Sequence, residues 1–190
     1  MHMNLDQLKS PERPAPVALQ ADIPAERFML RPLRRSDSGL LALYAGDQRV
    51  ARMTISIPHP LPPGAIDAYI SRATAQDRGS DIWALDASGQ GGSEVLGVIS
   101  LKRIDTAQSE IGYWVAPPFW NTGHGSEAVR ALVEANPQNS STIFASVFQD
   151  NAASARVLTN CGFEYIGDAE AYCLARSAKV PTWTYLRRMG

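Results

Sequence analysis

The sequence has 190 residues, of which 45% are hydrophobic and 19% are charged, and its formal net charge is −1. This length and composition are typical of one globular domain that buries its own core. A charge so close to zero argues against sequence-independent binding to nucleic acid or to an anionic membrane surface, because both need a concentrated basic face. No run of about 18 apolar residues is present, which argues against a membrane-spanning helix.

The two cysteines, Cys161 and Cys173, are too few for a disulfide framework, and no group of Cys and His residues has the spacing of metal ligands. Together with the lack of an apolar leader segment, this predicts a cytoplasmic protein with reduced thiols and no bound metal. Residues 1–25 form an N-terminal arm with several prolines and no periodicity, a composition typical of a loose segment. Residues 26–190 are expected to form a single domain.

The first part of this domain predicts one strand followed by three helices. Residues 28–32 have the pattern of a short strand. Ser36 and Asp47 are good N-cap residues, and each is expected to begin a short helix. A stiff, proline-rich connector at 58–64 leaves no room for regular structure, and residues 65–76 then predict an amphipathic helix.

Three strands are expected next. Residues 81–86 and 94–103 predict a pair of strands joined by a glycine-rich turn. A tight turn leads into the third strand, residues 109–115, which alternates apolar and polar residues. Pro117 and Pro118 end this strand, because neither can donate to a strand ladder. The three strands are expected to form an antiparallel meander.

A glycine loop then opens directly onto a helix. Gly123 and Gly125 let the backbone approach a ligand closely, and the free N–H groups at a helix start favour an anion. The segment therefore predicts a phosphate or pyrophosphate site, with a plain structural turn as the alternative. The spacing of Ala128 and Asp150 also fits a dinucleotide fingerprint, but residues 116–122 separate the preceding strand from the first glycine and argue against it.

The rest of the chain completes a mixed sheet. A strand at 142–148 must return on the same side as the preceding helix, and Asn151 caps a further helix. Residues 164–172 and 182–188 predict a closing hairpin-like pair of strands. The order β-α-α-α-β-β-β-α-β-α-β-β predicts an α/β (α+β) fold, with a mixed sheet flanked by helices.

Two motifs together resemble the acetyl-CoA binding core of the GNAT N-acetyltransferase superfamily. They comprise the glycine loop and the later capped helix with its end: Gly123, Gly125 and Ser126, then Asn151, Ser154, Gly162 and Phe163. The resemblance covers residues 27–189. It is greatest to the branch that contains the ribosomal-protein N-terminal alanine and serine acetyltransferases, through the Glu-Ile-Gly-Tyr-Trp strand, the Ser-Glu-Ala-Val helix start and the Asn-x-x-Ser-x-Arg-Val helix.

This resemblance implies a GNAT-type, mostly antiparallel sheet whose central strands splay apart to admit the pantetheine arm. It implies acetyl-CoA as co-substrate without a metal, and direct transfer of the acetyl group to a primary amine within a ternary complex. The acceptor would be a protein N-terminal α-amine or a small amine, and the protein a monomer or homodimer. The residues expected to hold the cofactor are Trp114, Val115, Trp120, Asn121, Thr122, Gly123, His124, Gly125, Ser126, Asn151, Ser154 and Arg156.

Three groups are candidates for the chemistry of acetyl transfer. Glu110 is placed to act as general base through a water, and the alternative is an exposed carboxylate in a cross-strand pair. The backbone N–H at Val115 can donate to the thioester oxygen. Ser154 can donate to the departing sulfur, and the alternative is an ordinary helix-surface serine. Asn151 can hold the pantetheine amides, whereas His124 is interpreted as a loop side chain and not a base.

Three positions depart from the family pattern. Trp120 stands where Gln or Arg is usual, and Thr122 where Lys or Arg is common, so a polar or cationic contact near the pyrophosphate is missing. Leu158 stands where many members place a tyrosine acid, so another group must protonate the sulfur. These departures keep a second function class open, namely a non-catalytic acyl-CoA-binding or partner-binding module on the same fold.

Overall fold

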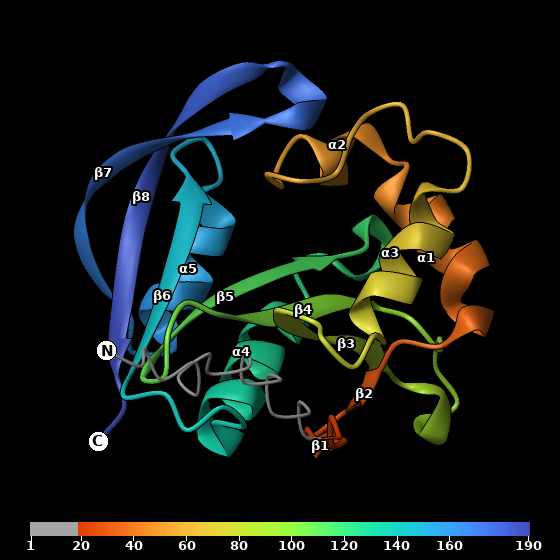
Figure 1. Ribbon diagram of the computed structural model, residues 1–190, viewed down its shortest axis with the longest axis horizontal. Helices are drawn as coiled ribbons and strands as arrows, with labels where there is room; N and C mark the ends of the chain where they lie inside the picture. Colours follow the sequence, from red (N-terminus) through yellow and green to blue (C-terminus); the bar gives the residue numbers. More distant parts are fainter. Residues whose placement is uncertain (1–18) are drawn as a thin grey trace, which may run out of the picture.

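The computed structural model describes residues 19–190, which form an open sheet with helices on both faces (Figure 1). The eight strands lie in the order β1-β2-β3-β4-β5-β6-β8-β7, with β5 and β6 parallel and the other neighbours antiparallel. The strands are β1 (Ile23–Pro24), β2 (Met29–Pro32), β3 (Ser80–Asp86), β4 (Gly97–Arg103), β5 (Gln108–Val115), β6 (Thr142–Phe148), β7 (Glu164–Cys173) and β8 (Ala178–Arg188). The helices are α1 (Ser38–Ala45), α2 (Gln48–Ala51), α3 (Ala65–Ala73), α4 (His124–Ala135) and α5 (Ala152–Asn160). The predicted mixed, mostly antiparallel fold is confirmed.

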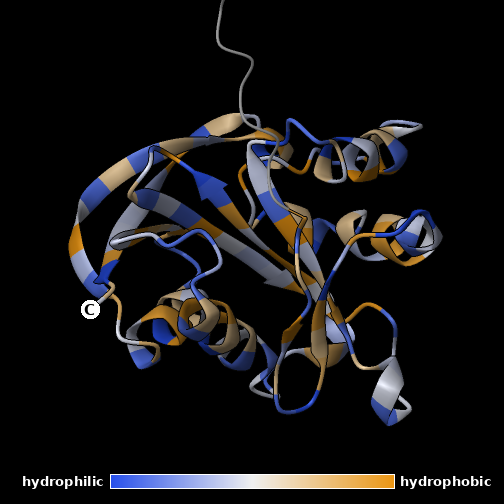
Figure 2. Cartoon of the chain, turned by 60° about the horizontal axis from the view of Figure 1, so that its bottom comes forward, coloured by the Kyte–Doolittle hydropathy of each residue, from blue (hydrophilic) through white to orange (hydrophobic). Residues whose placement is uncertain are grey.

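Alternate residues of the central strands face two separate hydrophobic cores. In β3, Trp83 and Leu85 belong to the larger core with α4 and α5, whereas Ala84 between them belongs to the smaller core with α1 and α3. Side chains alternate between the two faces along a strand, so the cores lie on opposite faces of the sheet. Figure 2 shows hydrophobic residues concentrated along the central strands and alternating with hydrophilic ones on the helices.

The central strands β5 and β6 pair over only part of their length. Their parallel register ends where Ile111 lies opposite Ala145, although β5 continues to Val115 and β6 to Phe148. Beyond that point the two strands diverge, as Figure 1 shows. The splayed central strands expected from the sequence are therefore confirmed, and the polar backbone groups along this stretch of β5 have no strand partner on that side.

Two predicted helix caps are confirmed. The side chain of Asp47 accepts a hydrogen bond from the N–H of Arg49 at 2.8 Å, at the start of α2. The side chain of Asn151 accepts one from the N–H of Ser154 at 3.2 Å, at the start of α5. Both satisfy backbone donors that a helix start leaves without an intrahelical partner.

The predicted cap of the first helix is wrong. Ser36 lies within a 3-10 turn, Arg35–Asp37, and α1 begins only at Ser38. The carboxylate of Asp37 accepts from the N–H of Arg34 at 2.7 Å and is engaged in a buried ion cluster. A turn held by tertiary contacts replaces the local cap that the sequence favours.

The end of the predicted N-terminal arm lies against the sheet. Residues 1–18 fall outside the described part of the chain, but residues 19–25 contain β1, which pairs with β2. The indole N–H of Trp83 donates to the carbonyl of Ala21 at 2.9 Å. A strand of two residues is too short for any periodicity, which is why the sequence gives no sign of it.

Among residues 19–190, none of the helices has the length and apolar character needed to cross a bilayer.

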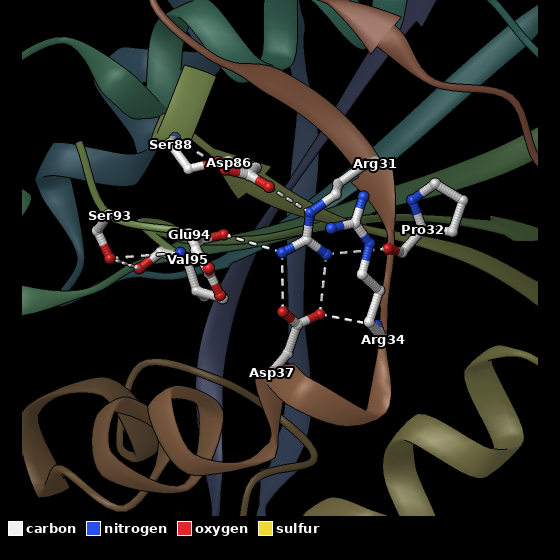
Figure 3. A network of polar contacts seen from close by, with 9 residues as sticks. All are labelled: Arg31, Pro32, Arg34, Asp37, Asp86, Ser88, Ser93, Glu94 and Val95. Carbon is white, nitrogen blue, oxygen red and sulfur yellow. Dashed lines mark hydrogen bonds and ion pairs between the residues drawn. The ribbon is translucent and has the colours of Figure 1, made fainter. Parts of the chain in front are cut away.

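A buried ion cluster joins β2 to the start of α1 and the end of β3 (Figure 3). Arg31 is only 2% exposed, and its Nη1 and Nη2 donate to the carboxylate of Asp37 at 2.9 and 2.8 Å, while its Nε donates to Asp86. Nη2 also donates to the backbone oxygen of Glu94 at 3.1 Å. Burial lowers the pKa of Arg31, but the hydrogen bonds that it donates to the two carboxylates raise the pKa by more, so the guanidinium stays charged.

Replacing Arg31 with lysine should lower the free energy of unfolding by about 2 kcal/mol, because an ammonium cannot satisfy both carboxylates in this forked geometry. Thermal unfolding followed by circular dichroism should then show a midpoint about 4–8 °C lower. Arg35→Lys, at an exposed position two residues before Asp37, is the matched control and should leave the midpoint unchanged. Equal midpoints for the two variants would show that the cluster contributes no net stability.

Candidate functional site

Two cavities meet where β5 and β6 diverge. We call them the loop cavity, of about 590 Å³, which borders the glycine loop, and the sheet cavity, of about 870 Å³, which lies over the face that α1 and α3 cover. Three residues line both cavities: Met53, Tyr113 and Trp114. A ligand in one cavity can therefore reach a ligand in the other at this junction.

The loop cavity is built from the end of β5, the glycine loop, α2 and the first turns of α5. Of the residues expected to hold a cofactor, all except Thr122 line it. Gly123 precedes α4 with φ +81°, in the left-handed region that favours glycine. The first hydrogen bond of α4 runs from the N–H of Glu127 to the Gly123 carbonyl at 3.1 Å. The N–H groups before Glu127 are thus free of the helix ladder at the positive end of its dipole.

Arg27 braces this loop from the turn before β2. The carboxylate of Glu127, in the first turn of α4, accepts from the N–H and the Nε of Arg27, both at 2.6 Å. Nη1 of Arg27 donates to the carbonyl of Thr122 at 2.9 Å. The guanidinium therefore neutralises a buried carboxylate that would otherwise repel an anion at the helix start, and it fixes the loop's path.

Among the described residues that line the loop cavity, the charged ones are all arginines: Arg49, Arg52 and Arg156. The guanidinium of Arg49 lies 5.5 Å from the centroid of the Trp120 ring. Only Arg156 was predicted; the other two come from the region of α2, far away in the sequence. A cation thus stands beside Trp120, where the family pattern would place Gln or Arg within the loop itself. Asp47 pairs with Arg49 at 2.7 Å, whereas Arg52 and Arg156 form no ion pair with a described carboxylate, so the cavity favours an anionic ligand.

The end of β5 presents backbone groups to the junction. Ala116 N–H donates to the Leu96 carbonyl at 2.8 Å, on the side away from β6. Successive residues of a strand point their N–H and C=O groups to opposite edges, so those of Val115 point toward the diverging β6. The indole N–H of Trp120 donates to the Val115 carbonyl at 2.6 Å. The N–H of Val115 remains as a donor on the cavity side.

Ser154 and Tyr113 form a hydroxyl pair on the wall of the loop cavity. The Ser154 hydroxyl donates to the Tyr113 hydroxyl at 2.8 Å, which in turn donates to the Ser154 carbonyl at 3.0 Å. Burial raises the pKa of Tyr113 well above its ordinary value, so the phenol stays protonated. Leu158 is fully buried in the core and faces away from the cavity. Tyr113, which the sequence analysis did not select, is the phenol closest to Ser154.

Glu110 lies in the sheet cavity and not with the other candidates. In the β4–β5 register it is opposite Lys102, on the same face as Trp114 further along β5. The rise of a strand places its backbone about 10 to 13 Å along β5 from Tyr113 and Trp114. Glu110 therefore reaches the junction only through intervening water.

The tip of the β7–β8 hairpin lies near α2 (Figure 1), and Leu174 in it lines the sheet cavity. Arg176 donates from Nε to the carbonyl of Arg52 at 2.7 Å and pairs with Asp150 at 2.7 Å, immediately before the cap of α5. The hydrogen bond that Arg176 donates to Asp150 lowers the pKa of the Asp150 carboxyl. Leu174 N–H donates to the Ile55 carbonyl at 3.2 Å. The segment after α2, which borders both cavities, is thereby held against the start of α5.

His124 and the cysteines take structural positions. The ring of His124 packs against Phe28 and Phe119, with centroids 5.9 and 6.2 Å away, and its Nδ1 hydrogen-bonds the Thr122 hydroxyl. Cys161 and Cys173 are free and buried. Within residues 19–190, no three His, Cys, Asp or Glu side chains are grouped as metal ligands would be.

Comparisons with known proteins agree with this geometry. Residues 27–164 match a family model described as an acetyltransferase (GNAT) domain. An uncharacterized N-acetyltransferase of Bacillus subtilis, YoaA, is 24% identical over 165 residues, covering 84% of this chain and 92% of YoaA.

Two solved structures share the fold. The ribosomal-protein-S5-alanine acetyltransferase of Vibrio fischeri has a TM-score of 0.72 at 18% identity, covering 90% of this chain and 97% of that one. The spermidine N-acetyltransferase of Vibrio cholerae, solved with CoA and spermine, has a TM-score of 0.73 at 12% identity, covering 86% of this chain and 96% of that one.

Proposed function

The chain belongs to the GNAT acetyltransferase family, and from that premise we propose that it transfers the acetyl group of acetyl-CoA directly to a primary amine. The cofactor occupies the loop cavity and the amine occupies the sheet cavity. The observation that carries this assignment is the junction at Met53, Tyr113 and Trp114, where the two cavities meet. Reactants held on either side of it need no covalent enzyme intermediate to react.

The proposed cofactor position follows from the charges and donors of the loop cavity. The pyrophosphate binds the N–H groups from Gly123 to Ser126, with cationic help from Arg49 and Arg156. The pantetheine arm lies along the free edge of β5, and its amides hydrogen-bond the backbone there and the side chain of Asn151. The thioester then reaches the N–H of Val115, which donates to its carbonyl oxygen as negative charge develops.

The proposed reaction is a single acyl transfer. The neutral amine nitrogen attacks the thioester carbon, the C–N bond forms, and the C–S bond breaks when the tetrahedral intermediate collapses. Before the attack, an ordered water in the sheet cavity relays the ammonium proton to the carboxylate of Glu110, which leaves the amine neutral. The acylated nitrogen loses its extra proton to water. The departing thiolate takes a proton from the Ser154 hydroxyl, which Tyr113 holds in place and which that water reprotonates, or directly from water.

The test is an assay of thiol release from acetyl-CoA with N-terminal peptides and small amines, with the acetylated product identified by mass spectrometry. We expect release with at least one amine and one acetyl group transferred per thiol. The competing assignment is a module that binds acyl-CoA without catalysis, which the residues Trp120, Thr122 and Leu158 favour. That module would show a thermal shift with acetyl-CoA but no amine-dependent thiol release, and this result would overturn the proposal.

A further inference from the structure

The charges of the sheet cavity are unevenly balanced. Among the described residues that line it, three carry a positive charge, Arg72, Arg78 and Lys102, and one carries a negative charge, Glu110. All four belong to the end of the cavity formed by the C-terminal part of α3, the loop after it and the paired strands β4 and β5. This end is therefore electropositive.

The carboxylates nearby do not cancel this charge. Asp81 pairs with both Arg78 and Arg103, at 2.8 and 2.7 Å, so one negative charge serves two guanidinium groups. Lys102 lies directly opposite Glu110 in the register, yet no ion pair within 4.0 Å joins the two in the described chain. Arg72 likewise makes no ion pair with a described residue, and its side chain is exposed. Two cations, Lys102 and Arg72, thus share this end of the cavity with one carboxylate, Glu110, and a net positive charge remains for a ligand.

The opposite end of the cavity is apolar. Met53, Ile55 and Leu174 line it near the junction, with Trp114 and Phe148 from the sheet. Tyr69 also lines this cavity, and burial raises the pKa of its phenol to about 12. A ligand that fills the cavity therefore meets apolar side chains beside the junction and cations at the far end.

Building on the proposed function, we propose that the acceptor is a peptide-like amine with an acidic group several residues from the reacting nitrogen, bound near Lys102 and Arg72. The register places Lys102 four positions along β4 from Val98, which lies opposite Trp114. That separation is about 13 Å, the length of about four extended residues. An N-terminal peptide with Asp or Glu at its fourth position fits this arrangement.

The same charges disfavour a polyamine. A linear polycation needs carboxylates along its length to replace the water it loses, and among the described lining residues only Glu110 offers one. Its remaining ammonium groups would lie beside Lys102 and Arg72. On this ground we expect the chain to prefer a different acceptor from that of the spermidine N-acetyltransferase that shares its fold.

The experiment compares three C-terminally amidated hexapeptides, Ala-Ala-Ala-X-Ala-Ala, in which X is Asp, Asn or Lys, together with spermidine. All three peptides present the same α-amine, so kcat/KM reports the distant charge alone. We expect kcat/KM to fall in the order Asp, Asn, Lys. At low salt it should fall about fivefold for each unit of charge, and at high salt by less. Spermidine should be the poorest acceptor.

Charge-reversed variants locate the effect. In each of the variants Lys102→Glu and Arg72→Glu, kcat/KM for the Asp peptide should fall below that for the Asn peptide. The control is Lys179→Glu, at an exposed position that lines neither cavity, and it should keep the parental order of kcat/KM. Arg72→Glu is the cleaner variant because Arg72 is on α3 and not opposite Glu110. A preference for the Lys peptide or spermidine in the parent protein would overturn the inference, as would an unchanged order in both variants.

Binding of the same peptides to the CoA-saturated protein separates this inference from the proposed function. If the peptides bind in the predicted order but release no thiol from acetyl-CoA, the charge preference stands and the catalytic proposal fails. If thiol release occurs with a reversed order, the catalytic proposal stands and the charge preference fails. Isothermal titration calorimetry measures the binding directly.

Discussion

Replacing Gly125 with glutamate should abolish acetyl-CoA binding without unfolding the protein. Gly125 lies in the first turn of α4, and a Cβ built there would meet Val157 at 3.7 Å and Val115 at 3.8 Å, which are ordinary contacts. The position can therefore carry a side chain. A glutamate would place its carboxylate in the loop cavity, against the phosphates and at the helix start that should attract them. We expect affinity to fall at least about 100-fold, by roughly 2.7 kcal/mol or more.

The measurement is the thermal shift of each variant at increasing acetyl-CoA concentrations. Ligand at about 100 times its dissociation constant should stabilise the parent by about 2.7 kcal/mol, and the Gly125→Glu variant should show no shift at the same concentration. Gly125→Ala is the matched control, because its Cβ fits and brings no charge, and it should retain most of the shift. A normal shift in the glutamate variant would place the phosphates elsewhere.

The features that the sequence predicts correctly are those that local rules determine. The glycine loop opens directly onto α4 with Gly123 at its N-cap, and Asn151 caps α5 through the N–H of Ser154. The glycine-rich turn between β3 and β4 and the apolar alternation of β5 likewise predict the meander. Each of these signals depends on residues within a few positions of one another, so the sequence carries it directly.

The partners that the sequence analysis missed are brought in by tertiary contacts. Arg27 meets Glu127 from 100 positions away, and Arg176 reaches Arg52 across 124 positions. No local pattern distinguishes these arginines from exposed ones elsewhere in the chain. Arg49 has a local partner in Asp47, but its position over Trp120 depends on how α2 packs beside the loop.

Tyr113 could have been found by a closer use of the strand pattern. It lies on the same face of β5 as Ile111, which is the face that packs against α4 and α5. A polar phenol on a helix-facing position needs a hydrogen-bond partner, and Ser154 on α5 is the one it has. Tyr113 thus supplies a phenol beside Ser154, although Leu158 stands at the position where the family pattern has a tyrosine.

Replacing Glu110 with glutamine should lower kcat at neutral pH by about 10²- to 10⁴-fold, the usual contribution of a positioned general base. The amide keeps the shape of the side chain but cannot accept the ammonium proton through water. Binding of acetyl-CoA should change little, because Glu110 lines the sheet cavity and not the loop cavity. Steady-state kinetics with a peptide acceptor, together with the acetyl-CoA thermal shift, separate the two effects.

The pH dependence distinguishes a base from a structural carboxylate. An N-terminal amine has a pKa of about 8, so raising the pH supplies neutral amine from solution and should narrow the deficit of Glu110→Gln relative to the parent. Glu134→Gln, on an exposed position of α4 that lines neither cavity, is the matched control and should follow the parent at every pH. Ser154→Ala should lose less activity than Glu110→Gln, since water can replace a hydroxyl donor at the sulfur. If Glu110→Gln keeps the parental rate across the range, Glu110 is only a strand carboxylate opposite Lys102 in the register, and the neutral amine comes from bulk solvent.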